Sequence, residues 1–233
     1  MLVFDIETDG LLDEVAKVHC MVIKDTDTGE LVRYRPSEVK QGVDKLLQAD
    51  CICGHNVIAF DIPVLEKLYG VVFDRERVID TLVLARLVYS NINDIDAGLI
   101  RKGILPRNLY GRHSLKAYGY RLGELKGTYA EDTENCWAVF TEEMLEYNAQ
   151  DVIVTAKLYD KLVSKGFTKQ ASDIEHKAQW LCQTMEHNGF PFNLRKAYAL
   201  KMVLEKEYLT LTEELTTKAP LIPDRIFVPK RDN

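Results

Sequence analysis

Residues 2–7, Leu-Val-Phe-Asp-Ile-Glu, form a short apolar run from which two carboxylates emerge one residue apart. Alternate side chains of an extended strand point the same way, so Asp5 and Glu7 share one face and can bind one hard cation. The other copies of this spacing lie in polar stretches or at a helix start, where solvated charges or helix caps are the better interpretation. These copies are Asp74/Glu76, Asp132/Glu134 and Asp173/Glu175. Only the first copy predicts a metal-binding strand.

Two later segments add acidic side chains to this first pair. The stretch 55–61, His-Asn-Val-Ile-Ala-Phe-Asp, precedes a predicted helix and places Asp61 at a strand-to-helix junction. An isolated Asp there would ordinarily be read as an N-cap. Tyr147 and Asp151 are four residues apart in a helical pattern and so lie on one helix face. A buried Asp on an apolar helix needs a partner, and a metal is the strongest one available.

In this order, the five side chains resemble the three motifs of the DEDDy exonuclease family, a branch of the ribonuclease-H-like (DnaQ-like) fold. They are Asp5, Glu7, Asp61, Tyr147 and Asp151. The related family with His in place of Tyr carries it five residues before the last Asp, where this sequence has Glu146. The tyrosine branch is therefore favoured. The resemblance implies an α/β fold with a mixed five-stranded sheet flanked by helices.

The resemblance also implies a reaction, the two-metal hydrolysis of single-stranded or frayed DNA 3′ ends with Mg²⁺ or Mn²⁺. It implies that Asp5 bridges both ions, while Glu7 and Asp151 complete the first site. Asp61 would support the second ion through water, and Tyr147 would orient the attacking water. An all-oxygen ligand set is the kind that these cations prefer.

The same comparison implies contacts to the nucleic acid. Leu11, six residues after Asp5, would lie against the terminal base, although packing in the core is an equally good interpretation for an apolar residue in a turn. The other expected contacts are Thr8, Asn56, Phe60, Arg112, His113, Lys116 and Arg121.

The whole chain resembles the front of a family A DNA polymerase of the phage type that recruits thioredoxin. Residues 5–12, 79–84 and 113–124 resemble its proofreading domain, and residues 174–192 resemble the start of its polymerase domain. This implies an exonuclease domain over 1–168 and a second segment over 172–233. A polymerase domain or subunit is the expected partner. The family's polymerase motifs have no counterpart before Asn233, so we expect neither DNA synthesis nor thioredoxin binding from this chain.

Composition agrees with these expectations. With 233 residues and 46% hydrophobic content, the chain can bury one substantial core and carry an appended helical piece. It has no apolar stretch of the roughly 20 residues that span a membrane and no basic leader, so we expect a soluble protein in the cytoplasm. Its five cysteines show no zinc spacing and are expected to be reduced thiols.

The net charge of -6 is unevenly distributed. Residues 101–126 carry +6 and the remainder -12, which suggests a basic rim for phosphates beside an acidic metal site. Tyr110, Tyr118 and Tyr120 are interleaved in the basic stretch and could stack on bases. For each of these residues taken singly, a solvated helix face or a core tyrosine is the simpler interpretation.

Hydrophobic periodicity predicts strands near 1–6, 18–24, 30–35, 51–54 and 77–80, the second and third forming a hairpin. It predicts helices over 37–48, 62–69, 81–89, 113–121 and 141–164, with Asp80 as an N-cap. A domain boundary is expected near 166–171. Beyond it we expect a capping box from Ser172 to Glu175, a helix end at Asn188-Gly189, and a second helix from Asn193 that ends before Pro220. These two helices would form a C-terminal hairpin.

Two other functions remain open from the sequence. One is a ribonuclease-D-like RNA-processing exonuclease with the same metal site, which the polymerase-like C-terminal segment disfavours. The other is a scaffold that has kept the fold and lost its chemistry, which the intact set of five residues disfavours.

Overall fold

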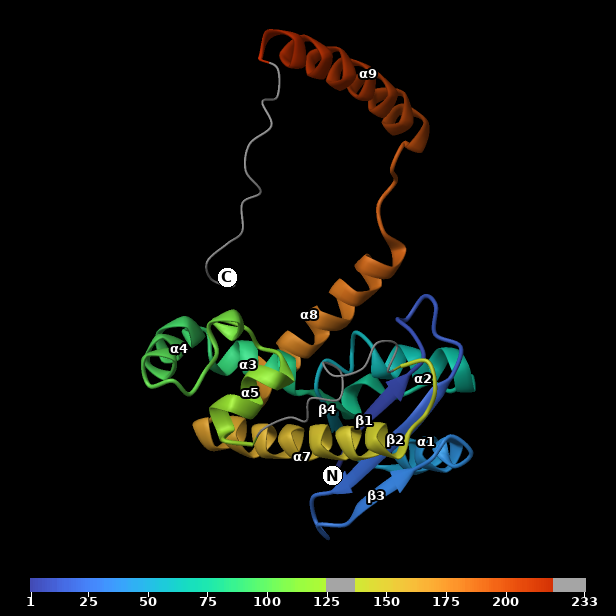
Figure 1. The fold of residues 1–233 in the computed structure, drawn as a ribbon. Helices are drawn as coiled ribbons and strands as arrows, with labels where there is room; N and C mark the ends of the chain where they lie inside the picture. The colour runs from blue at the N-terminus through green and yellow to red at the C-terminus, as the bar shows by residue number, and fades with distance from the viewer. Residues whose placement is uncertain (125–136, 220–233) are drawn as a thin grey trace. The chain divides into compact units, whose positions relative to one another are not determined.

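The central layer is a mixed sheet with the strand order β3-β2-β1-β4-β5 (Figure 1). The protein is represented by a computed structural model that describes residues 1–124 and 137–219, and all structural statements refer to those residues. β1 pairs antiparallel with β2 and parallel with β4. The strands are β1 (Leu2–Thr8), β2 (Val18–Asp25), β3 (Leu31–Tyr34), β4 (Ile52–Gly54) and β5 (Val78–Asp80). The predicted α/β fold class and the β2–β3 hairpin are confirmed.

Helices flank the sheet, and further helices follow them in the chain. They are α1 (Val39–Gln48), α2 (Asp61–Tyr69), α3 (Thr81–Val88), α4 (Ile92–Arg101), α5 (Leu115–Leu122), α7 (Glu142–Lys165), α8 (Lys169–Asn188) and α9 (Leu194–Lys218). Two short 3-10 turns, η1 (Arg75–Arg77) and η2 (Arg107–Leu109), complete the regular structure of the described residues. Among the described residues, no helix is both long and apolar enough to cross a membrane.

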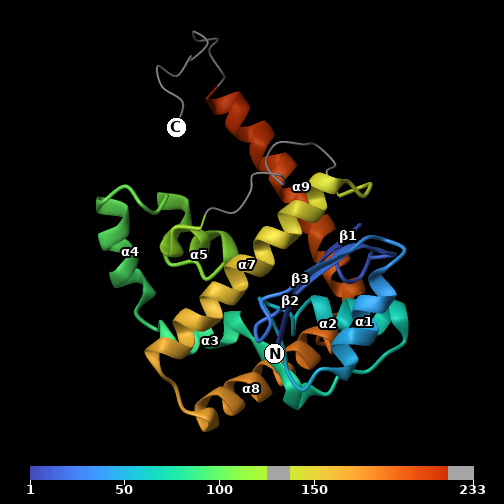
Figure 2. The ribbon, with the colours of Figure 1, turned by 90° about the horizontal axis from the view of Figure 1, so that it is seen from below.

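The alternation of side chains along β1 decides where its carboxylates point. Phe4 is buried in a core that β1 shares with α1 and α2. Val3 is buried in a separate core with Val152 of α7, and Figure 2 shows α7 on the opposite side of the sheet from α1 and α2. Asp5 and Glu7 have the same parity as Val3, so they emerge on the α7 face. Burial of each large apolar side chain contributes about 1.5–3 kcal/mol, which holds the acidic face of β1 against α7.

The structure differs from the sequence prediction in two helices, one that was not predicted and one that begins earlier than predicted. α4 was not predicted, because its Asn, Asp and Gly residues are poor helix formers. The predicted capping box at Ser172 and Glu175 is wrong, since α8 already begins at Lys169. Thr168 supplies the cap, and its hydroxyl accepts a hydrogen bond from the Ala171 N–H at 3.1 Å. Ser172 and Glu175 therefore lie within the helix.

Both predicted features between α8 and α9 are confirmed. Gly189 follows the end of α8 with φ of 61°, a left-handed conformation that glycine adopts without strain. Asn193 caps α9, accepting a hydrogen bond from the Lys196 N–H at 2.9 Å.

Contacts divide the chain into two units, Met1–His187 and Asn188–Asn233. α8 contributes Trp180 to the core of the first unit, whereas the predicted boundary near 166–171 would place this helix in the second. In the second unit, α9 buries none of its residues. The packing of α8 and α9 as a hairpin stays a prediction.

Candidate active site

Three carboxylates converge where β1 meets α7. Asp5 and Glu7 from β1 and Asp151 from α7 each offer a ligand oxygen, and these atoms all lie within 4.8 Å of one another. Three like charges at such distances repel unless a cation or a proton neutralises them. The negative field reaches the neighbouring strand β2, because the pKa of the Cys20 thiol opposite Glu7 is raised by burial and further by Glu7 and Asp5. The cluster is therefore suited to a divalent cation.

The three carboxylates line a cavity of about 280 Å³, together with other residues of β1 and α7 and residues from three other parts of the chain. The complete lining is Asp5, Ile6, Glu7, His55, Asn56, Phe60, Asp61, Trp137, Tyr147 and Asp151. All five predicted motif residues thus reach one cavity. The cavity also contains His55 and Trp137, which the sequence analysis did not single out.

Asp61 enters the cavity as the first residue of α2. It is 4% exposed, and its Oδ1 accepts a hydrogen bond from the Ile6 N–H of β1 at 3.3 Å. Burial raises the pKa of this carboxyl to about 7, although hydrogen bonds to its own and the Ile6 backbone N–H act in the opposite direction. A buried acid of this kind is stabilised by a proton or by a bound cation. Its simple interpretation as an N-cap is wrong, since Phe60 occupies that position.

Tyr147 and Asp151 lie one helical turn apart on α7, as predicted, and both line the cavity. The Tyr147 ring meets Trp137 edge to face, with ring centroids 6.2 Å apart. Asn148, which lies between Tyr147 and Asp151 on α7, is fully buried and donates a hydrogen bond from Nδ2 to Asp5 Oδ2 at 2.8 Å. No feature of the sequence distinguishes Asn148 from the other polar residues of α7.

The loop between β4 and α2 brings His55, Asn56 and Phe60 to the cavity. A Cβ on Gly54 would lie 2.1 Å from Val57 Cγ1 and 3.0 Å from the Phe4 carbonyl oxygen, so glycine is required where the loop leaves the sheet. Asn56 has φ of 66°, a left-handed conformation that is uncommon outside glycine and that asparagine adopts more often than most other residues. Such strain is maintained only where the surrounding structure holds it.

Asp80, at the end of β5, holds this loop. Its carboxylate accepts hydrogen bonds from the N–H groups of Asn56 (2.8 Å), Ile58 (3.1 Å) and Leu82 (2.8 Å). The predicted N-cap of α3 is confirmed by the Leu82 bond, and the other two bonds extend that role to the loop. The Asp80 N–H donates to His176 Nε2 of α8 at 2.8 Å. Residues from β5 and α8 therefore fix the loop that borders the cavity.

The predicted nucleic-acid contacts are distributed unevenly. Asn56 and Phe60 line the cavity. Thr8 is buried, and its hydroxyl donates to the Gly10 carbonyl at 2.9 Å. Leu11 is 75% exposed, so packing in the core is wrong for this residue and a role at the surface remains.

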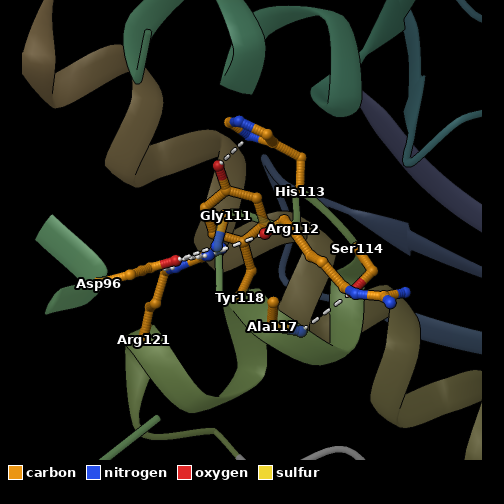
Figure 3. A network of polar contacts seen from close by, with 8 residues as sticks. All are labelled: Asp96, Gly111, Arg112, His113, Ser114, Ala117, Tyr118 and Arg121. Atoms are coloured by element: carbon orange, nitrogen blue, oxygen red, sulfur yellow. Dashed lines mark hydrogen bonds and ion pairs between the residues drawn. The ribbon is translucent and has the colours of Figure 1, made fainter. Parts of the chain in front are cut away.

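The basic segment contains one residue whose position contradicts its predicted role. Arg121 is paired with Asp96 of α4 through Nε at 2.9 Å and Nη2 at 2.8 Å, and its side chain is only 7% exposed (Figure 3). Asp96 also accepts from the Gly111 N–H at 2.8 Å. Arg121 therefore stabilises the fold instead of contacting phosphates. The pairing was not predicted because it depends on the unpredicted helix α4.

Tyr118 of this segment is in the core, and the half-buried His113 contacts it. Tyr118 is 2% exposed, so its interpretation as a core tyrosine is confirmed and the alternative of stacking on a base is wrong. Its hydroxyl lies 2.8 Å from His113 Nδ1, and the pKa of His113 is lowered chiefly by burial and then by nearby Arg121. Arg112 is exposed, and its side chain extends away from Asp96 in Figure 3. Lys126 and Asp132/Glu134 lie outside the described residues.

The fold and the site place this chain in a known class, and a family model agrees. The model of the RNase_H superfamily matches residues 2–163, so the chain belongs to this superfamily. Among solved structures, NrnC of Brucella melitensis with bound Mg²⁺ is similar in fold. Its TM-score is 0.55 at 22% identity, covering 83% of this chain and 88% of that one.

Within the superfamily, the chain is similar to two phage proteins. It is 40% identical to the DNA-directed DNA polymerase of Escherichia phage T7 and 39% identical to that of Enterobacteria phage T3. Both alignments cover 93% of this chain. The chain spans 37% of the length of either relative. The predicted resemblance to a phage polymerase is confirmed.

Proposed function

We propose that this chain is a metal-dependent 3′–5′ exonuclease of the DEDDy type. The observation that carries the proposal is the convergence of Asp5, Glu7 and Asp151 in a cavity that Asp61 and Tyr147 also line. Carboxylates also cluster in structural calcium sites, but membership of the RNase_H superfamily and the likeness to phage DNA polymerases support a nuclease.

The residues present fit two divalent cations. Asp5, Glu7 and Asp151 would hold one ion, and Asp5 and Asp61 would support the second. The donor set consists of carboxylate oxygens, which suit Mg²⁺ or Mn²⁺, and the buried Asp61 is an acid for which a cation can replace a proton. When bound, such ions stabilise the charge on the attacking and leaving oxygens of a phosphodiester.

The chain's own residues position the other reactants. The Tyr147 hydroxyl orients the attacking water, and its ring is kept in place against Trp137. Asn56 and Phe60 bind the terminal nucleotide at the wall of the cavity. Leu11, on the exposed turn after β1, contacts the terminal base and favours a frayed strand over a paired end.

The substrate and setting follow from the polymerase relatives. We infer that the enzyme removes nucleotides from DNA 3′ ends and proofreads for a polymerase domain or subunit during phage replication in the host cytoplasm. Arg112 and Lys116 remain the basic residues assigned to the single-stranded backbone. Thioredoxin is not expected to bind residues 1–233.

The proposal is tested with DNA and RNA oligonucleotides of the same sequence, labelled at the 5′ or the 3′ end, in Mg²⁺, in Mn²⁺ and in EDTA. We expect stepwise shortening of 5′-labelled DNA and release of the 3′ label as a mononucleotide, both abolished by EDTA. Faster cleavage of RNA would favour the ribonuclease-D-like alternative. A folded protein that cleaves neither substrate would favour the scaffold.

A further inference from the structure

We propose that Asn148 is a positioning residue, which fixes the orientation of the Asp5 carboxylate for cation binding. The inference rests on the proposed function and deepens it. Asn148 lies on α7 between Tyr147 and Asp151, and it is fully buried. Its Nδ2 donates to Asp5 Oδ2 at 2.8 Å, across the contact between α7 and β1.

The hydrogen bonds of Asn148 are one-sided. A carboxylate only accepts, so the amide must turn its N–H toward Asp5. Its Oδ1 is buried and has no hydrogen-bond partner within the described residues. Leaving a buried acceptor unsatisfied is destabilising, and an Asn that served only the fold would be expected to satisfy both ends. The arrangement is explained if the role of Asn148 is to orient the Asp5 carboxylate.

That effect is on the rotation of the carboxylate. The terminal torsion of an Asp side chain is broad, so the torsion by itself does not determine where the carboxylate oxygens point. A hydrogen bond to one oxygen fixes the plane of the group beside Glu7 and Asp151. α7 then contributes both a ligand, Asp151, and the residue that orients the ligand on β1. Partners of this kind typically change metal affinity or activity by 10- to 100-fold when removed.

The test is Asn148→Leu, which has a similar volume and no donor. We expect Mn²⁺ binding, measured by electron paramagnetic resonance and by calorimetry, to weaken roughly 10- to 100-fold, with cleavage weakened in parallel. The melting temperature in EDTA should stay the same or rise, because an unsatisfied acceptor has been removed. A merely structural Asn would give the reverse pattern, with a lower melting temperature and unchanged Mn²⁺ affinity.

Thr155→Val is the matched control. Thr155 is buried on the same helix, and its hydroxyl has no partner within the described residues, so its loss should leave Mn²⁺ affinity unchanged. If Asn148→Leu does not fold, Asn148→Ala decides the question by the same binding measurement. Parental Mn²⁺ affinity in the folded variant would overturn the inference alone. A parent protein that binds Mn²⁺ without cleaving would overturn the proposed function while the binding comparison still stands, and one that binds no Mn²⁺ would overturn both.

Discussion

Two charged clusters in the first unit differ in net charge and in surroundings. Asp5, Glu7 and Asp151 bring three negative groups within 4.8 Å of one another at the wall of a cavity. Asp96 and Arg121 bring one negative and one positive group into contact at 2.8 Å, with side chains 0% and 7% exposed. The first arrangement gains from a cation supplied from outside, whereas the second is neutral by itself. Balance of charge, and not burial alone, separates the cluster suited to binding from the cluster that holds the fold together.

The largest expected effect is on the acidic cluster. Asp5→Ala and Asp151→Ala each remove a ligand, so cleavage should fall roughly a thousandfold or more, the equivalent of about 4 kcal/mol of charge stabilisation in the transition state. Stability in EDTA should hold or rise for Asp151→Ala because repulsion is relieved. For Asp5→Ala the same gain is offset, because the buried Asn148 Nδ2 loses its acceptor. Gel assays and thermal melts measure the two quantities. Substantial activity in Mg²⁺ would remove these residues from the site.

The opposite pattern is expected for the neutral pair. Arg121→Met leaves Asp96 buried without its counter-charge, which should cost about 3–5 kcal/mol of the free energy of unfolding. Arg112→Met is the control, because that side chain is exposed and should change stability by less than about 0.5 kcal/mol. Urea titrations measure both. Equal, small changes would show that the buried pair contributes little.

The raised pKa of Asp61 should make the stability of the metal-free protein depend on pH. The folded state keeps the Asp61 proton up to a pKa of about 7, while the unfolded state releases it near the ordinary pKa of an Asp side chain, 3.8. This stabilisation is complete below the unfolded value and is lost as pH rises through the folded value, a decrease of at most about 4 kcal/mol. Asp61→Asn should flatten the decrease in EDTA melts between pH 4 and 7, and an unchanged slope would assign it to another group.

A smaller effect is expected from Tyr147→Phe, which keeps the ring against Trp137 and removes the hydroxyl. Loss of water orientation should slow single-turnover cleavage roughly 10- to 100-fold while the metal dependence is kept. Unchanged rates would make Tyr147 a packing residue of the cavity wall.

The smallest expected effect is on the salt dependence of binding to single-stranded DNA. Because Arg121 is already paired, the test of the basic segment reduces to Arg112→Gln with Lys116→Gln. Each lost phosphate contact should lower the slope of log affinity against log salt by roughly 0.7 for a single strand. The slope is measured by fluorescence anisotropy of a labelled oligonucleotide across a salt series, in Ca²⁺ to suppress cleavage. Lys40→Gln and Lys45→Gln on α1 are the control pair. A parental slope would require another path for the DNA.

The sequence predicted what short-range pattern determines. Period-two alternation placed Asp5 and Glu7 on one face of β1, and four-residue spacing placed Tyr147 and Asp151 on one face of α7, so both pairs reached the same cavity. The strands and most helices were recognised for the same reason. These features depend on backbone geometry that is repeated every few residues.

The sequence could not predict pairings between distant segments. Asp96 and Arg121 are 25 residues apart and meet only because α4 and α5 pack together. Asn148 and Asp5 are 143 residues apart, and nothing near either residue encodes their contact. The start of α8 was misplaced because two local capping signals compete, and Thr168 is the one that the fold uses.

The hydrogen bond from the Asp80 N–H to His176 bears on how such a unit can be exchanged between proteins. The loop beside the cavity is held by Asp80, and Asp80 is held in turn by a helix that follows the last strand by many residues. Transplanting residues 1–168 alone would leave a buried N–H without its acceptor and would remove Trp180 from the core. Recombination between genes would therefore preserve this site only where the crossover falls after α8, so that the helix is inherited together with the carboxylates.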